Sequence, residues 1–162
     1  IRGDEADSKK LLAELASVRP AFGRGEAIDI DGTPLEIILV KNPSGFRLAL
    51  SSYADRPAAT MIAINDNYAD GRDMSWLWDV DFASLRGEKT GVTMVSGVRA
   101  YDMALRLQYD DVLVGKVETD IAQATDIFLK KTTGTRRIFC TYTAMLAMRR
   151  HLAKTYTLEP IE

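Results

Sequence analysis

The sequence has very little of what covalent and metal-based chemistry usually requires. Its 162 residues include one cysteine and one histidine, so an internal disulfide and a cysteine-based zinc site are excluded, and a reducing compartment suits the chain. No apolar run approaches the roughly 20 residues of a membrane-spanning helix, and no signal peptide is recognisable. Basic and acidic residues nearly balance, at 21 and 23, so no basic field would attract nucleic acid.

What is present suits one ordinary globular domain. Hydrophobic residues make up 46% of the chain and charged residues 27%, and this length is enough to bury a sizeable core. The chain starts with Ile1 rather than methionine. We therefore expect residues 1–162 to be a single domain excised from a longer protein.

Strand-like and helix-like segments alternate along the chain. The pattern predicts a helix at 7–20 and then a hairpin with its turn at Asp31-Gly32. The mostly apolar run Leu35 to Val40 is typical of a strand buried on both faces. Helices follow at 43–53, 75–85, 98–110, 120–134 and 143–156, and strands at 58–65, 91–97, 111–117 and 136–142. This alternation predicts an α/β fold with a doubly wound, mostly parallel sheet flanked by helices.

Three polar loops should lie at the carboxyl edge of this sheet, where open α/β folds bind ligands. They are KNPSG (41–45), NDNYADGRD (65–73) and SGVRA (96–100). The SGVRA turn precedes a helix, so Ser96, Arg99 and backbone amides could hold a phosphate or carboxylate. The other glycines of a dinucleotide fingerprint are missing, as is the G-x-x-x-x-G-K-[ST] phosphate loop. The chain is therefore not expected to use ATP alone.

The stretch from Ile64 to Phe82 combines acidic and aromatic residues in an unusual density. It contains two tryptophans, Trp76 and Trp78, and five aspartates: Asp66, Asp70, Asp73, Asp79 and Asp81. An acidic turn is one interpretation, because aspartate and asparagine bond to nearby backbone amides and Asp73 could cap a helix near Ser75. Two large aromatic residues beside a charged loop are also typical of a binding surface. We expect the side chain of at least one of the two tryptophans to be buried in the core, because large aromatic side chains usually are.

A metal site is a poor match to the same stretch. Asp66, Asp70 and Gly71 correspond to positions 1, 5 and 6 of a calcium-binding loop. Tyr68 and Leu77 then stand at positions 3 and 12, where an oxygen ligand and a bidentate glutamate are needed. We expect no metal here.

The chain does not assemble a nucleophilic site of its own. His151 lies on the last predicted helix, and Cys140 ends a strand with no histidine near it in the sequence. A solvated histidine and a buried core thiol are the better interpretations. The aspartates then look like half of a site whose other half is on another chain.

Five segments in order resemble the C-terminal domain of the MurT family. They are GRGE, LVKNPSGF, NDNYADGRDMSWLWDVDF, SGVRAYDMALRLQYDDV and TYTAMLAMRRHL, and they extend from about Gly23 to Leu152. MurT proteins are Mur-ligase-like synthetase subunits of the MurT–GatD lipid II isoglutaminyl synthase. The acidic-tryptophan segment is long and far more specific than a single glycine turn.

The resemblance implies a Mur ligase C-terminal fold and a role in a cytoplasmic complex. A preceding ATP-binding region would hold ATP and Mg²⁺, with no cofactor in this domain alone. The complex would amidate D-glutamate of lipid II with ammonia that GatD releases from glutamine. The three polar loops would line one cleft that faces the ATP-binding region, with Lys41, Asn42, Ser96 and Arg99 near substrate or nucleotide anions.

The resemblance also implies that this domain docks GatD. An aspartate of the DG-x-D-x-S-W region would complete the Cys–His pair of the glutaminase in trans, with Asp73 as the first candidate and Asp70 as the second. Arg72, Trp76 and Trp78 are the expected docking residues. Two other functions remain open: the substrate- and nucleotide-binding C-terminal domain of a partner-free Mur-type peptide ligase, and a free-standing regulatory binding domain.

Overall fold

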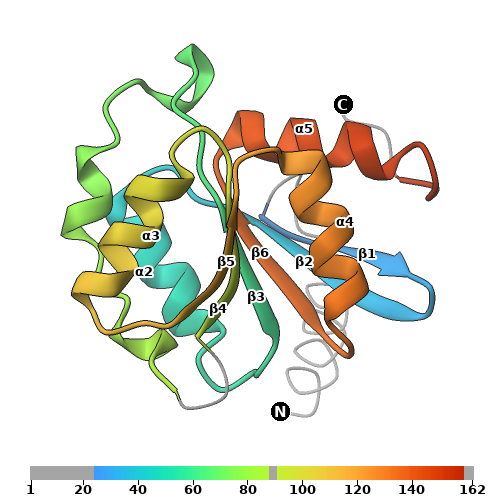
Figure 1. Ribbon diagram of the computed structural model, residues 1–162, viewed down its shortest axis with the longest axis horizontal. Coiled ribbons are helices and arrows are strands. Elements are labelled where there is room, and N and C mark those ends of the chain that lie inside the picture. Colours follow the sequence, from blue (N-terminus) through green and yellow to red (C-terminus); the bar gives the residue numbers. More distant parts are fainter. Residues whose placement is uncertain (1–23, 88–90, 159–162) are drawn as a thin grey trace, which may run out of the picture.

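A six-stranded sheet runs through the middle of the molecule and carries helices on both faces (Figure 1). The structure is a computed structural model that describes residues 24–87 and 91–158. The strand order is β1-β2-β6-β3-β4-β5, with bounds Arg24–Ile30, Thr33–Leu39, Ala59–Ala63, Val92–Ser96, Val114–Glu118 and Arg136–Cys140 for β1 to β6. Only the β1–β2 pair is antiparallel among these ladders. The predicted mostly parallel sheet is confirmed, and the helix predicted at 7–20 lies outside the described residues.

The edge hairpin forms where its turn residues predict it. Asp31 and Gly32 have φ angles of 54° and 77°, the left-handed pair that a two-residue hairpin turn requires. The Asp29 carboxylate accepts the Gly32 N–H at 2.8 Å and holds the turn closed. The strand that follows, β2, is buried along most of its length because it pairs with both β1 and β6.

Within the described residues, two helices cover each face of the sheet. Helices α2 (Pro43–Ser52) and α3 (Ala100–Tyr109) lie on one face, and α4 (Ile121–Lys131) and α5 (Tyr142–Leu152) on the other (Figure 1). Each layer has its own apolar core: Phe46 and Met103 belong to the first, and Phe128 and Met145 to the second. None of the helices within the described residues is both long and apolar enough to cross a membrane.

The order of the strands creates a switch point around β6. The chain passes from β2 through α2 to β3 on one face, and it leaves β6 for α5 on the other. In open α/β sheets the carboxyl ends of strands at such a point are where ligands bind. Asn42, Asn65 and Thr141 follow the three strands that meet there.

The segment after β3 differs from the single short helix predicted at 75–85. It forms three separate turns of 3₁₀-helix, η1 (Tyr68–Asp70), η2 (Ser75–Asp79) and η3 (Ala83–Leu85). The backbone is extended at Val80, between the second and third turns. The guanidinium group of Arg106 donates to the carbonyls of Leu77 and Val80, and the Leu77 carbonyl also accepts the Val80 N–H that ends the second turn.

Candidate functional site at the carboxyl edge of the sheet

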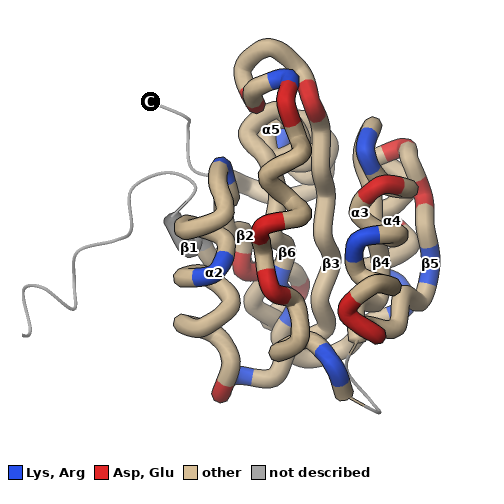
Figure 2. The backbone as a smooth tube through the Cα atoms, turned by 90° about the vertical axis from the view of Figure 1, so that its left-hand side faces the viewer, with Lys and Arg blue, Asp and Glu red and all other residues tan. Residues whose placement is uncertain are grey.

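The acidic loop (residues 65–73) leaves β3 at the carboxyl edge of the sheet. In Figure 1 this loop, in green, rises above the sheet beside the start of α5. Figure 2 shows acidic and basic positions close together at its tip. The loop then passes into the tryptophan segment (residues 74–82), which descends over the face that carries α3.

Asp70 anchors the loop to the first turn of α5. Its side chain is buried, with 6% of its surface exposed. One carboxylate oxygen accepts the Thr143 N–H at 2.7 Å, and the other accepts the Thr143 hydroxyl at 2.6 Å and the Asn67 N–H at 3.0 Å. A carboxylate that accepts N–H groups at a helix N-terminus stabilises the helix through both the bonds and the helix dipole. Asp70 is thus fully engaged within its own chain.

Asn65 ties the acidic loop to two neighbouring loops. Its N–H donates to the Thr141 hydroxyl at 2.9 Å, while its side-chain carbonyl accepts the Val98 N–H at 3.0 Å. This close approach needs Gly97, whose φ is +93° and whose added Cβ would lie 2.4 Å from the Ile64 carbonyl oxygen. The predicted glycine turn SGVRA therefore contacts the acidic loop directly.

Asp73 is the candidate that faces solvent. It is exposed, and its hydrogen bonds within the described residues are to Ser75, whose N–H lies 2.9 Å from Asp73 Oδ1. The hydroxyl and the backbone N–H of Ser75 together lower the pKa of Asp73 below its ordinary value. Asp73 is therefore an ionised, accessible carboxylate at neutral pH.

The tryptophan segment is braced by a buried arginine. Arg106, on α3, is 7% exposed and lies against the rings of Trp78 and Phe82, 5.5 and 5.4 Å from their centroids. It also pairs with Asp110 at 2.9 Å. Burial alone would raise the pKa of Asp110, but the bonds from the Arg106 guanidinium and the Phe82 N–H outweigh it and lower that pKa.

The two tryptophans occupy different environments. Trp76 is partly buried against the core of the α2–α3 face. Trp78 is 48% exposed and meets the ring of Tyr109 edge to face, at 5.2 Å between centroids. Arg72, the third predicted docking residue, is exposed in the acidic loop.

The predicted anion-binding residues differ in whether they contact the acidic loop. Arg99 lies beside it, but its charge is compensated by Asp102 at 2.8 Å and Asp66 at 3.6 Å. Ser96 is fully buried. Asn42 caps α2, with its side chain accepting the Gly45 N–H at 2.8 Å, and Lys41 beside it is exposed. No hydrogen bond or ion pair joins Lys41 or Asn42 to the acidic loop in the described part of the chain.

The described residues contain no group of three or more histidine, cysteine or carboxylate side chains that could hold a metal ion. Cys140 is buried at the end of β6. His151 lies 2.7 Å from Asp126, between α5 and α4. Neither residue belongs to the carboxyl-edge site.

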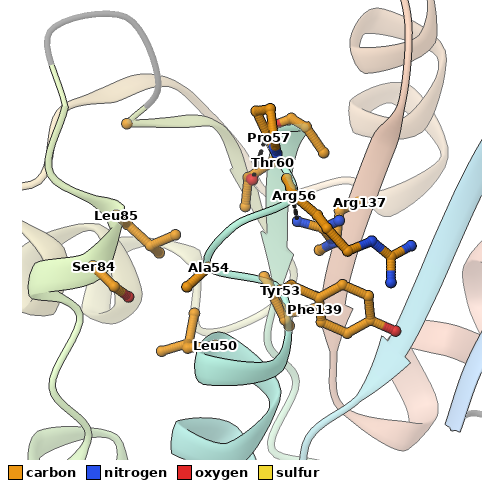
Figure 3. A pocket seen from close by; sticks show the side chains of 12 residues that line it. Leu50, Tyr53, Ala54, Arg56, Pro57, Thr60, Ser84, Leu85, Arg137 and Phe139 are labelled. Atoms are coloured by element: carbon orange, nitrogen blue, oxygen red, sulfur yellow. Dashed lines mark hydrogen bonds between the residues drawn. The ribbon is translucent and has the colours of Figure 1, made fainter.

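Sequence reasoning missed a buried charge cluster near the opposite edge of the sheet. Glu36 pairs with Arg137 at 2.7 Å and with Arg56 at 2.6 Å, and the Arg137 guanidinium lies 4.2 Å from the Tyr53 ring centroid. A cavity of about 130 Å³ adjoins the two arginines, with Leu50 and Leu85 on its other side (Figure 3). The sequence did carry a signal for this cluster, because the strand-like runs 35–40 and 136–142 contain charged residues.

Comparison with known proteins relates most of the chain to one family. The MurT ligase C-terminal family model matches residues 39–145. The chain is 32% identical over 152 residues to the lipid II isoglutaminyl synthase (glutamine-hydrolyzing) subunit MurT of Streptococcus pneumoniae, a match that covers 91% of this chain and 34% of that protein. It is 41% identical over 92 residues to the subunit of the same name from Staphylococcus aureus, covering 55% of this chain and 21% of that protein. The chain spans about a third or less of the length of these curated relatives.

Solved structures share the fold at low sequence identity. Folylpolyglutamate synthase from Thermotoga maritima matches with a TM-score of 0.55 at 18% identity, over 91% of this chain and 34% of that one. MurF from Acinetobacter baumannii matches with a TM-score of 0.57 at 13% identity, over 90% of this chain and 32% of that one. These likenesses concern the fold alone, and they agree with the predicted Mur ligase C-terminal type.

Proposed function

The chain belongs to the MurT ligase C-terminal family, and from that membership we propose that it is the C-terminal domain of the synthetase subunit of a glutamine-hydrolysing lipid II isoglutaminyl synthase. The whole enzyme would amidate D-glutamate of the peptidoglycan stem peptide at the cytoplasmic face of the membrane. It would draw on ATP and on ammonia released from glutamine. This domain would close the synthetase site and dock a glutaminase of the GatD type.

The observation that carries the catalytic part of the proposal is the contrast between Asp70 and Asp73. A carboxylate that serves another chain must be exposed, ionised and held in a defined position. Asp73 meets the first two conditions through its exposure and its lowered pKa. Asp70 is buried and already accepts three hydrogen bonds. We therefore assign the role in trans to Asp73.

The chemistry of that role follows from what a cysteine–histidine pair lacks. A carboxylate that accepts the Nδ1–H of the partner's imidazole fixes the tautomer whose Nε2 takes the proton of the cysteine thiol. The same carboxylate stabilises the imidazolium ion while the thiolate attacks the amide carbon of glutamine. The imidazolium then gives its proton to the departing ammonia, and water releases glutamate from the thioester. The ionised state of Asp73 suits it to the first two steps.

The docking role falls to the surface next to Asp73. Arg72 directly precedes Asp73 and is exposed like it, and Trp78 presents about half of its surface to solvent. Arginine and tryptophan are enriched among the residues that dominate protein interfaces. Trp76 is more deeply packed, so its contribution would be to support the segment from behind.

ATP and Mg²⁺ would be held mainly by the part of the protein that precedes this chain. Lys41 and Arg99 would face the anions of nucleotide or substrate from the carboxyl edge, with Arg99 sharing its charge with Asp66 and Asp102. The side chains of Asn42 and Ser96 are occupied or buried. Their contribution would be to shape the two turns.

A partner-free Mur-type peptide ligase is the competing function. Folylpolyglutamate synthase and MurF share the fold with this chain at 18% and 13% identity, whereas MurT subunits match it at 32% and 41%. The acidic-tryptophan segment lies within the residues matched by the MurT family model. Co-purification of a glutaminase with the full-length protein separates the two functions.

The direct test is glutamine hydrolysis by the glutaminase in complex with the full-length protein. Asp73→Asn keeps the shape and removes the charge. In a serine triad such a change lowers kcat roughly 10⁴-fold, and we expect a loss of about 10²-fold because a cysteine nucleophile depends less on its base. The affinity between the two subunits should change little.

Asp79→Asn is the matched control, because Asp79 is an exposed aspartate of the neighbouring turn η2. It should leave hydrolysis unchanged. If Asp73→Asn binds the glutaminase and supports full hydrolysis, the role in trans is wrong and the acidic loop is a docking surface only.

A further inference from the structure

The Thr143 hydroxyl is the centre of a hydrogen-bond network beneath the acidic loop. It lies 3.0 Å from the side-chain nitrogen of Asn65, 2.8 Å from that of Asn67 and 2.6 Å from Asp70 Oδ2. Amide nitrogens only donate, so the hydroxyl accepts two bonds and gives its single hydrogen to Asp70. Every bonding direction of this hydroxyl is thereby fixed.

The orientation of the Asn65 amide is fixed independently. Its oxygen accepts the Val98 N–H, which leaves the nitrogen to face Thr143. The network therefore connects α5, the end of β3 and the turn before α3. Fully satisfied polar networks of this kind specify one local arrangement, because any alternative leaves buried polar groups without partners.

The network sets the position of Asp73 through a short span. Asp70 and Met74 are 6% and 5% exposed, and the exposed residues 71–73 lie between them. Met74 belongs to the core of the α2–α3 face, while Asp70 is bonded to α5. Consecutive Cα atoms are 3.8 Å apart, so a span of three residues between two buried anchors leaves Asp73 little freedom.

From these contacts we propose that Thr143 and Asp70 are positioning residues for the carboxylate that this protein presents to the glutaminase. The inference rests on the proposed role of Asp73. Thr143 acts from α5, about 70 residues further along the chain, by holding Asp70 and with it the near end of the span. Because a misplacement of about 1 Å costs on the order of 100-fold in rate, loss of the network should lower turnover without removing any group that touches substrate.

The test compares two substitutions of Thr143 in the full-length protein bound to its glutaminase. Thr143→Val has the same shape without the hydroxyl, and Thr143→Ser keeps the hydroxyl. We expect Thr143→Val to lower kcat for glutamine hydrolysis by about 10- to 100-fold, with an unchanged KM for glutamine and unchanged affinity between the subunits. Thr143→Ser should restore turnover close to that of the wild type.

The pH profile of kcat/KM separates positioning from catalysis. Asp73→Asn should change the profile, because it removes the charge that stabilises the partner's imidazolium ion. Thr143→Val should lower the whole profile and keep its shape. Where Thr143→Val does not fold, Asn67→Ala provides a milder variant, since Asn67 is exposed and donates one bond to the hydroxyl. It should lower kcat in the same way and by a smaller factor.

The outcomes are distinguishable. If Thr143→Val folds and supports full turnover while Asp73→Asn lowers hydrolysis as expected, the positioning role is wrong and the proposed function stands. Equal losses in Thr143→Val and Thr143→Ser, or a loss confined to subunit affinity, also overturn it. If Thr143→Val does not fold, full turnover by Asn67→Ala overturns the positioning role instead. Full hydrolysis by Asp73→Asn removes the proposed function itself.

Discussion

The cluster of Glu36, Arg137 and Arg56 places a single carboxylate between two guanidinium groups. Glu36 and Arg137 are 8% and 4% exposed, whereas 61% of the Arg56 side chain is exposed. Removing one partner of a buried ion pair leaves an uncompensated charge and costs about 3–5 kcal/mol. We expect Glu36→Gln to lower the melting temperature by roughly 6–20 °C, at about 2–4 °C per kcal/mol for a domain of this size. Thermal unfolding followed by circular dichroism measures it.

Arg56→Gln is the control for that change. The exposed arginine is screened by solvent, and such pairs contribute less than about 1 kcal/mol. Equal shifts in the two variants would contradict the view that burial of Glu36 and Arg137 decides the effect.

At the residue scale the sequence alone left Asp70 and Asp73 as alternatives. The two aspartates stand three positions apart in the same polar loop, and local pattern does not distinguish them. The difference arises from Thr143, which lies more than 70 residues later and makes Asp70 a buried helix cap. A long-range contact of that kind has no local signature.

The pairing of α3 with the tryptophan segment makes stability depend on pH. The folded-state pKa of Asp110 is lowered, so its contribution is present above the unfolded pKa of about 3.9 and is lost as the pH falls through the folded value. Asp110→Asn should lower stability at pH 7 by about 1–2 kcal/mol, since hydrogen bonds to a charged group are lost. The gap between wild type and variant in denaturant unfolding should narrow as the pH falls below about 4.

Asp111→Asn is the matched control. Asp111 is exposed and has a φ of 54°, a conformation that asparagine tolerates well. Its effect should stay within about 0.5 kcal/mol at both pH values. A gap for Asp110→Asn that persists undiminished at low pH would contradict the assigned ion pair.

At the element scale the predicted alternation of strands and helices is confirmed over the described residues. Periodicity and turn residues are local, and they suffice for the Asp31-Gly32 hairpin and for Pro43 at the start of α2. The insertion of β6 between β2 and β3 depends on pairing between segments that are distant in the chain. A single sequence contains no local pattern that indicates which distant strands pair. The 3₁₀ turns at 75–85 were missed for a similar reason. They are held by hydrogen bonds from Arg106 on α3, which is distant from them in the sequence.

The molecule as a whole should be inactive without its partners. The sequence has no phosphate-binding loop, Cys140 is buried, and His151 pairs with Asp126. We expect the purified chain to hydrolyse neither ATP nor glutamine, in coupled assays for phosphate and glutamate release. Activity that follows the protein through successive columns would contradict this expectation, and full-length protein with its glutaminase is the positive control.

The burial of Cys140 also makes the molecule suitable for site-specific fluorescence. The chain has no second cysteine, and a thiol shielded from solvent reacts slowly with maleimide dyes because the reagent needs an accessible thiolate. An Ala69→Cys substitution would then place an accessible thiol at an exposed position of the acidic loop, and this thiol would react with the dye rapidly. Emission from that dye would report, in real time, the arrival of a second protein at the tip of the acidic loop.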